Sequence, residues 1–244
     1  MPSPDEVVGY GPHPSQRVEL WLPEDGPPAA EGVALLLHGG YWRDRYDLRL
    51  MDPLSADLAQ RGWIAVNAEY RRVGADGGGW PATFDDVRAA AEVAADLADE
   101  HHLPLVVVGH SAGGQLALWV AGEVAVDAVV ALAPVADLEE ASRRGLSDHA
   151  AHGLLGGSPA DHPARYAAAS PVRRLPLSTP VLLVHGDADA HVPVALSDAL
   201  ADQLRAAGDE VAYLRPVGVD HFAPIDPGSP EWHQVMGWLA EVPA

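Results

Sequence analysis

The chain has 244 residues, 48% of them hydrophobic, which is enough apolar material for one sizeable core. Its formal net charge of -20 disfavours nucleic acids and anionic membrane surfaces as partners, because their phosphates would be repelled. All 15 cationic side chains are arginines and the cysteine count is 0, so lysine nucleophiles, thiolate nucleophiles and sulfur-based zinc sites are excluded. We expect a single domain over residues 1–244.

The N-terminal residues have neither the basic start nor the apolar stretch of about 7–15 residues that is typical of a secretory signal. No apolar run approaches the roughly 20 residues of a membrane-spanning helix. We therefore expect a cytoplasmic protein without a membrane partner. The sequence leaves a homodimer open.

Short apolar runs recur between longer segments with helical spacing. The expected strands, in chain order, are 18–22, 33–37, 64–67, 105–108, 128–132, 181–184 and 211–214. The first alternates apolar and polar residues, which predicts an edge strand with one solvent face. In residues 84–97 and 196–204 the apolar side chains recur at the spacing of an amphipathic helix. Because the central runs are continuously apolar, the pattern predicts a doubly wound, mostly parallel sheet with helices on both faces.

One segment, from about 136 to 179, breaks the alternation of strands and helices. It is rich in small residues, has a turn-like stretch at 156–159 and contains no clean strand. Long irregular connections are often functional, so we interpret this segment as a small cap over the edge of the sheet. An ordinary surface excursion is the alternative.

A serine stands between two glycines where the expected strand 105–108 ends, in the run Gly109-His110-Ser111-Ala112-Gly113. The preceding strand and the following helical pattern are the context that a GxSxG motif requires, because the chain must turn sharply to expose the hydroxyl. This predicts Ser111 as a nucleophile. The helix start, with the N–H of Ala112 first, would face an oxyanion formed there. His110 is a candidate substrate-binding residue, with packing beneath the serine as the alternative.

A serine hydroxyl is a weak nucleophile, so it needs a base within hydrogen-bond reach and an acid that orients this base. With an elbow of this kind the acid and then the histidine follow the serine along the chain. Suitable side chains stand where expected strands end, which is where ligands bind in open α/β sheets. These side chains are Asp187 and Asp189 after one strand, His221 after the next, and Asp137 after an earlier one.

Four runs together resemble the α/β-hydrolase superfamily. They are HGGYW at 38–42, GHSAGG around Ser111, HGxxDxxVP at 185–193 and GxxHF at 218–222. The first resembles kynurenine formamidase and related small carboxylesterases, and the last two also resemble prolyl oligopeptidase-like catalytic domains. The resemblance implies an α/β-hydrolase fold, with Asp189 as the acid and His221 as the base. Asp187 stays open as the alternative acid.

The HGGYW run follows the expected strand 33–37 and resembles the HGGG-type oxyanion loop of esterases, with Tyr41 at its third glycine. By this resemblance Gly40 and Tyr41 donate backbone N–H groups to the oxyanion together with Ala112. The departure from HGGG leaves Gly39 open as a donor. Trp42 is a candidate substrate-binding residue, with packing under the loop as the alternative.

These residues predict acyl transfer to Ser111 and hydrolysis by water, with no metal and no cofactor. The substrate is expected to be a small-molecule ester or amide. An aryl formamide such as N-formylkynurenine, a short acyl ester and a small peptide are the alternatives, and the lack of a propeller-sized extra domain weakens the peptide. A non-catalytic binding protein of this fold is the hypothesis from another class, and candidates at all three triad positions count against it.

Four further side chains are suggestive. Arg43 and Arg45 follow the oxyanion loop and could bind a substrate carboxylate by paired hydrogen bonds, with an exposed helix start as the alternative. His149 and His152 have helical spacing that could suit a metal, but no third ligand is evident. We expect these two histidines on a solvated face.

Overall fold

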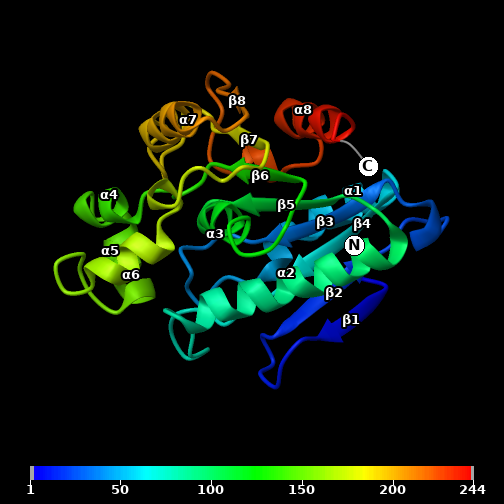
Figure 1. Ribbon diagram of the computed structural model, residues 1–244, viewed down its shortest axis with the longest axis horizontal. Coiled ribbons are helices and arrows are strands. Elements are labelled where there is room, and N and C mark those ends of the chain that lie inside the picture. Colours follow the sequence, from blue (N-terminus) through cyan, green and yellow to red (C-terminus); the bar gives the residue numbers. More distant parts are fainter. Residues whose placement is uncertain (1–2, 243–244) are drawn as a thin grey trace.

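A single sheet runs through the molecule, with helices on both of its faces (Figure 1). The computed structural model describes residues 3–242, and within them the sheet has 8 strands in the order β1-β2-β4-β3-β5-β6-β7-β8. The pairs β1·β2 and β2·β4 are antiparallel and the remaining pairs are parallel. The predicted doubly wound, mostly parallel sheet is confirmed.

The elements follow one another in the expected alternation. The strands are β1 (Glu6–Gly9), β2 (Arg17–Trp21), β3 (Gly32–Leu37), β4 (Trp63–Ala68), β5 (Leu105–His110), β6 (Ala128–Leu132), β7 (Val181–Val184) and β8 (Val211–Leu214). The α-helices are α1 (Asp52–Gln60), α2 (Ala82–His101), α3 (Ala112–Val120), α4 (Leu138–Arg143), α5 (Leu146–Leu155), α6 (Pro163–Ala169), α7 (Ala195–Ala207) and α8 (Pro230–Leu239). The 3₁₀ helices are η1 (Pro27–Ala29), η2 (Leu48–Met51), η3 (Pro171–Arg173) and η4 (Ala223–Ile225).

The core has two layers because strand side chains alternate between the faces of the sheet. On β3, Leu35 and Leu37 pack toward α2, α3 and α7, whereas Leu36 packs toward α1 and α8. All three leucines are fully buried. Burial of one such side chain stabilises a fold by about 1.5–3 kcal/mol, so the continuous apolar runs of the central strands supply much of the driving force.

The prediction that residues 18–22 form an edge strand with one solvent face is wrong. β1, which the sequence pattern did not indicate, pairs outside β2 and forms the edge in its place. The polar member of the alternation, Glu19, is only 2% exposed. Arg49 covers it with two hydrogen bonds of 2.7 and 3.1 Å, so a paired carboxylate occupies what looked like a solvent position.

The segment 136–179 forms α4, α5, α6 and η3 between β6 and β7. Its apolar side chains do not stand apart from the main domain, because Leu154, Leu155 and Tyr166 are buried in the same core as α2 and α3. The segment is therefore firmly packed on this side of the sheet. That it acts as a cap stays a prediction.

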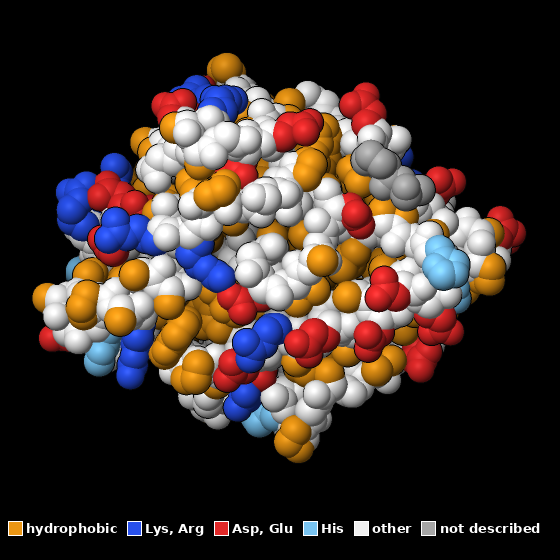
Figure 2. Space-filling model, viewed as in Figure 1, with side chains coloured by type: hydrophobic (Ala, Val, Ile, Leu, Met, Phe, Trp, Pro, Cys, Tyr) orange, Lys and Arg blue, Asp and Glu red, His pale blue; other side chains and the backbone are white. Residues whose placement is uncertain are grey.

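The surface in Figure 2 carries acidic side chains spread among arginines and apolar groups, without one large acidic patch. Within residues 3–242, no helix combines the length and the hydrophobicity that crossing a membrane requires.

The backbone packs very closely where α3 begins against the end of β3. A Cβ atom on Gly113 would lie 2.0 Å from the carbonyl oxygen of Leu37 and 2.5 Å from that of His38. A Cβ on Gly109 would in turn lie 2.1 Å from the Gly113 carbonyl oxygen. Both glycines of the GxSxG motif are thus required by close backbone packing.

We predict that Gly113→Ala lowers the free energy of unfolding by about 3 kcal/mol, since the added methyl group overlaps backbone that cannot move aside. Urea unfolding of the whole chain measures this loss. Gly237→Ala is the matched control, because Gly237 lies within α8 with no other group within 4 Å of an added Cβ. That variant should gain up to about 1 kcal/mol from helix propensity. Equal stability of both variants would contradict the packing argument.

Candidate active site

Ser111 occupies a sharp turn between β5 and α3. Its backbone angles, φ 57° and ψ -115°, lie outside the regions that side chains other than glycine usually adopt. Three hydrogen bonds hold the turn: the Ser111 N–H donates to Leu132 O at 2.8 Å, and Gln115 N and Val135 N each donate to Ser111 O at 3.2 Å. Such strain persists only where the surroundings fix it, and it is typical of functional sites.

His221 and Asp189 lie in contact, as the sequence resemblance implied. His221 Nδ1 is 2.5 Å from Asp189 Oδ2, and the Oδ1 atom accepts from the backbone N–H groups of His191 and Val192 at 2.7 and 2.8 Å. His185 Nε2 approaches the same carboxylate at 3.1 Å. Burial raises the pKa of Asp189, but the hydrogen bonds from His185 and His221 outweigh this and hold the pKa well below its usual value. Asp189 is therefore a buried carboxylate that stays ionised.

The two alternative acids lie elsewhere. Asp187 accepts a hydrogen bond from the Gly218 N–H at 2.7 Å and lies 3.8 Å from Arg215, so it braces the loop after β8. Asp137 caps α4 by accepting from Glu140 N at 2.9 Å. Of the three aspartates, the structure brings Asp189 to His221.

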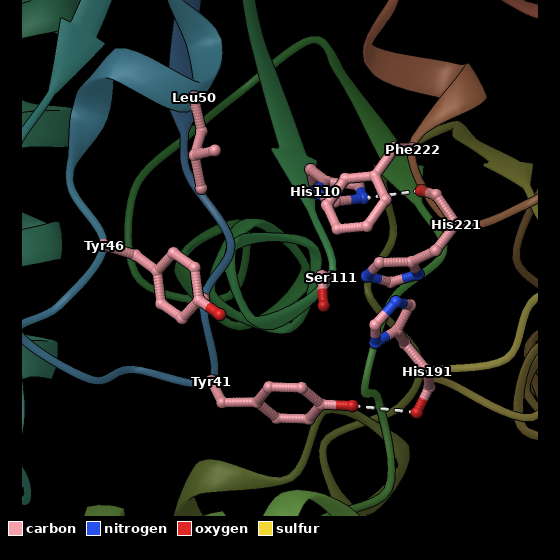
Figure 3. A pocket seen from close by; sticks show the side chains of 9 residues that line it. Tyr41, Tyr46, Leu50, His110, Ser111, His191, His221 and Phe222 are labelled. Carbon is pink, nitrogen blue, oxygen red and sulfur yellow. Dashed lines mark hydrogen bonds between the residues drawn. The ribbon is translucent and has the colours of Figure 1, made fainter.

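Ser111 and His221 line one small pocket, which opens to solvent and has a cavity volume of about 50 Å³. Its lining residues are Gly40, Tyr41, Tyr46, Leu50, His110, Ser111, His191, His221 and Phe222. Figure 3 shows a ring nitrogen of His221 facing the Ser111 side chain. Among the described residues no hydrogen bond joins these two side chains, which is common in ligand-free sites whose geometry tightens when substrate binds.

The HGGYW loop follows β3 and forms one wall of this pocket. Gly40, Tyr41 and Trp42 all have positive φ angles, of 110°, 52° and 58°. Within residues 3–242 the backbone N–H groups of Gly40, Tyr41 and Ala112 have no protein acceptor. Gly39 lies so close beneath the serine that an added Cβ would come within 3.1 Å of Ser111 Cβ. The loop thus offers free donors beside the serine and leaves no room for side chains at its glycines.

The Tyr41 side chain links this loop to the loop that carries Asp189. Its hydroxyl donates to the His191 carbonyl oxygen at 2.8 Å across the mouth of the pocket (Figure 3). Burial, and then the nearby Asp189 charge, raise the pKa of Tyr41 to about 12. The hydroxyl therefore remains a hydrogen-bond donor at neutral pH.

Trp42 does not reach the pocket, so its position does not support a substrate-binding role. It is 1% exposed, and its indole N–H donates to Gln115 Oε1 at 3.0 Å on α3. The large ring packs beneath the loop because a partner for its one polar atom lies there. His110, the other candidate, does line the pocket.

The remaining suggestive side chains make local contacts. Arg43 donates to the hydroxyl and the backbone carbonyl of Ser147, and Arg45 lies 4.8 Å above the ring of Tyr46. Neither arginine is among the residues that line the pocket. His152 bonds to Ser142 Oγ at 2.7 Å, and its ring centre lies 4.8 Å from that of His149.

Four pocket residues were not singled out in the sequence: Tyr46, Leu50, His191 and Phe222. His191 and Phe222 lie within the HGxxDxxVP and GxxHF runs, so their position next to the predicted acid and base could have indicated that they line the pocket. Tyr46 lies in a loop and Leu50 in the short 3₁₀ helix η2, and both segments are too short to show a periodic sequence pattern.

His110 lies directly behind His221. Its Nε2 is 2.9 Å from the His221 carbonyl oxygen, its Nδ1 has no partner among the described residues, and the two ring centres are 4.6 Å apart. Because a carbonyl only accepts, Nε2 carries the hydrogen. Burial, and then the neighbouring His221, lower the pKa of His110 from 6.5 to about 3. His110 is thus a neutral donor that holds the backbone of His221.

The protein has the α/β-hydrolase fold. Three features at the carboxyl ends of its mostly parallel sheet are typical of that fold: a serine on a sharp strand-to-helix turn, a loop with unbonded backbone N–H groups, and an aspartate–histidine pair. The sequence model of the family described as BD-FAE matches residues 18–204, and the chain belongs to that family.

Among curated relatives, esterase LipC of Mycobacterium tuberculosis is 27% identical, over 96% of this chain and 64% of its own length. Esterase LipQ of the same organism is 30% identical, over 82% of this chain and 52% of its own length. The chain therefore spans between about half and two thirds of these relatives. A truncated carbohydrate esterase from gut microbiota matches with a TM-score of 0.79 and 20% identity, over 98% of this chain and 96% of that chain, which is a likeness of fold.

The lowered pKa of His110 predicts a pH dependence of stability. Between about pH 6.5 and 3 the unfolded chain binds more protons at this site than the folded chain, so the contribution to stability falls as the pH falls, by up to about 1.4 kcal/mol per pH unit. In His110→Gln an amide N–H can still donate to His221 O, but nothing titrates. Its free energy of unfolding should therefore fall less steeply than that of the wild type.

Urea unfolding at about pH 6.5, 5.5 and 4.5 measures both slopes. His233→Gln, on an exposed position of α8, controls for loss of a histidine as such and should follow the wild type. Parallel slopes for the wild type and His110→Gln would contradict the assignment.

Proposed function

We propose that this chain hydrolyses carboxylic esters of short, neutral acids through an acyl-enzyme formed on Ser111. The observation that carries the proposal is the meeting of a strained serine, the His221–Asp189 pair and free backbone N–H groups at one pocket. The resemblance to two proteins named as esterases supports the choice of an ester as substrate.

The geometry suits a two-step mechanism. His221 Nδ1 donates to Asp189, which leaves Nε2 as the acceptor for the Ser111 hydroxyl proton. Ser111 Oγ attacks the ester carbonyl, and the N–H groups of Gly40, Tyr41 and Ala112 stabilise the negative oxygen of the tetrahedral intermediate. His221 then gives its proton to the leaving alcohol. Water, deprotonated by the same ring, releases the acid and restores Ser111.

This proton transfer orients the substrate in the pocket. The leaving alcohol must lie on the His221 side, where His191 and Phe222 form the wall. The acyl group then points to the opposite wall, where Tyr46 and Leu50 lie (Figure 3). A cavity of only about 50 Å³ favours a short acyl chain.

The charge of the substrate follows from the lining. Its described residues include no arginine, and the net charge of the chain is -20, so an anionic group on either part of the substrate would meet no arginine partner. N-formylkynurenine, which the HGGYW resemblance suggests, carries a carboxylate on its leaving amine, which would lie on the His221 side, and Arg43 is already bound to Ser147. This favours a neutral ester over the formamide, which remains a hypothesis for the same site.

A panel of p-nitrophenyl esters of increasing acyl length, with N-formylkynurenine beside them, tests the proposal. We expect the highest kcat/KM with the shortest acyl chains and a loss of turnover of about 10⁴-fold or more in Ser111→Ala. A fluorophosphonate probe should label the wild type and leave Ser111→Ala unlabelled. Undiminished turnover in Ser111→Ala would refute the proposal, and preferred cleavage of N-formylkynurenine would move it to the formamide.

The acid is tested by two variants of the same loop. Asp189→Asn should lower kcat by about 10⁴-fold on p-nitrophenyl acetate, because an amide no longer fixes the His221 tautomer that leaves Nε2 free. Asp187→Asn should keep kcat within about twofold, since Asp187 contacts Gly218 and Arg215 instead of His221. The reverse ranking of the two variants would make Asp187 the acid.

A further inference from the structure

A buried glutamate lies behind the pocket and contacts none of the reacting groups. Glu69, just past the end of β4, is 1% exposed. Its Oε1 atom accepts from Tyr70 N at 3.0 Å and lies 3.0 Å from His38 Nε2. Its Oε2 atom accepts from Leu48 N at 3.2 Å and from Arg72 Nη1 at 3.0 Å. Each of the two carboxylate oxygens is therefore approached by two protein groups.

Two of these donors hold the oxyanion loop. His38 is its first residue, and its ring lies between Glu69 and the loop backbone, with Nδ1 2.7 Å from the Gly39 carbonyl oxygen. The ring of Tyr70 stacks on that of His38 with centres 4.4 Å apart, and its hydroxyl donates to His38 O at 2.7 Å. The position of the loop therefore depends on Glu69 and its neighbour.

The other two donors hold the opposite wall. Leu48 begins η2, which carries Leu50 into the pocket. Arg72, which pairs with both Glu69 and Asp76, also donates to the Tyr46 carbonyl oxygen at 2.5 Å. Tyr46 and Leu50 form the acyl wall. The Tyr46 carbonyl is thus linked to Glu69 through Arg72, and η2, which carries Leu50, is linked to it through Leu48. One side chain connects the loop that would bind the oxyanion with the wall that would bind the acyl group.

We infer that Glu69 is a positioning residue that sets the distance between the oxyanion loop and the acyl wall. This rests on the proposed function for its catalytic consequence. A carboxylate suits this place better than an amide, because the NH₂ group of a glutamine would face the backbone N–H of Tyr70 or that of Leu48 and leave it unsatisfied. Glu69→Gln keeps the size of the side chain and removes this property.

The chain offers a matched control in Asp86, another carboxylate that is 1% exposed. It accepts from Arg71 N, Nε and Nη2 at 2.7–2.9 Å and from Gln16 Nε2 at 2.8 Å. Neither partner lines the pocket. Asp86→Asn therefore removes an equally buried, equally bonded charge without touching a pocket wall.

The experiment compares the two variants by amide hydrogen exchange and by kinetics. In Glu69→Gln we expect faster exchange in peptides covering 38–50, a fall in kcat of about tenfold or more on p-nitrophenyl acetate with a smaller change in KM, and equally weakened binding of a trifluoromethyl ketone that forms a tetrahedral adduct. Asp86→Asn should lose comparable thermal stability and change none of these three. Unchanged exchange at 38–50 in Glu69→Gln, or the same changes in Asp86→Asn, would overturn the inference.

A second variant covers the case in which Glu69→Gln does not fold. Tyr70→Phe removes only the hydroxyl that bonds to His38 O, and it should raise exchange at 38–42 and lower kcat several-fold at unchanged KM. Wild-type behaviour of Tyr70→Phe in both measurements would then reject the inference. The exchange data need no turnover, so an inactive wild type would refute the proposed function and still leave the positioning role decided.

Discussion

The first turn of α3 packs directly on the last carbonyl groups of β3, and the rest of the site depends on that contact. Only a residue without a side chain fits at Gly113, where an added Cβ would overlap Leu37 O. The contact fixes the serine at the start of α3 beside the loop that follows β3. Backbone packing thus places the serine next to the start of this loop, and the side chains behind the loop hold the rest of its course.

Around this contact the parallel strands bring together loops that are far apart in sequence. The ends of β3, β5, β7 and β8 lie at one edge of the sheet and supply the HGGYW loop, Ser111, Asp189 and His221 in turn. Behind them, buried polar side chains hold each loop: Glu69 for the first and His185 for the aspartate. Fully bonded networks of this kind make a site rigid, which is what stabilisation of a developing charge requires.

The sequence predicted those parts of the molecule whose residues follow a recognisable local pattern. Five strands covered on both faces, the elbow at Ser111 and the loops after β7 and β8 each have a pattern within about ten residues. The structure brings Asp189 to His221 as implied, while the catalytic roles stay predictions. The edge strand was wrong because Arg49, from another part of the chain, buries Glu19. The role of Glu69 could not be predicted from the sequence for the same reason, because its hydrogen-bond partners come together only in the folded chain.

The bridge from the Tyr41 hydroxyl to His191 O separates two tasks within one residue. In the proposed site the backbone N–H of Tyr41 serves the reaction, whereas its ring shapes the entrance. A substitution at this position therefore alters which molecules enter and leaves the chemistry to the main chain. Such a division would let the range of substrates change through this side chain while the donor to the oxyanion stays in the main chain. In this protein, a substitution that changes substrate specificity would therefore affect a side chain that takes no part in the proposed reaction.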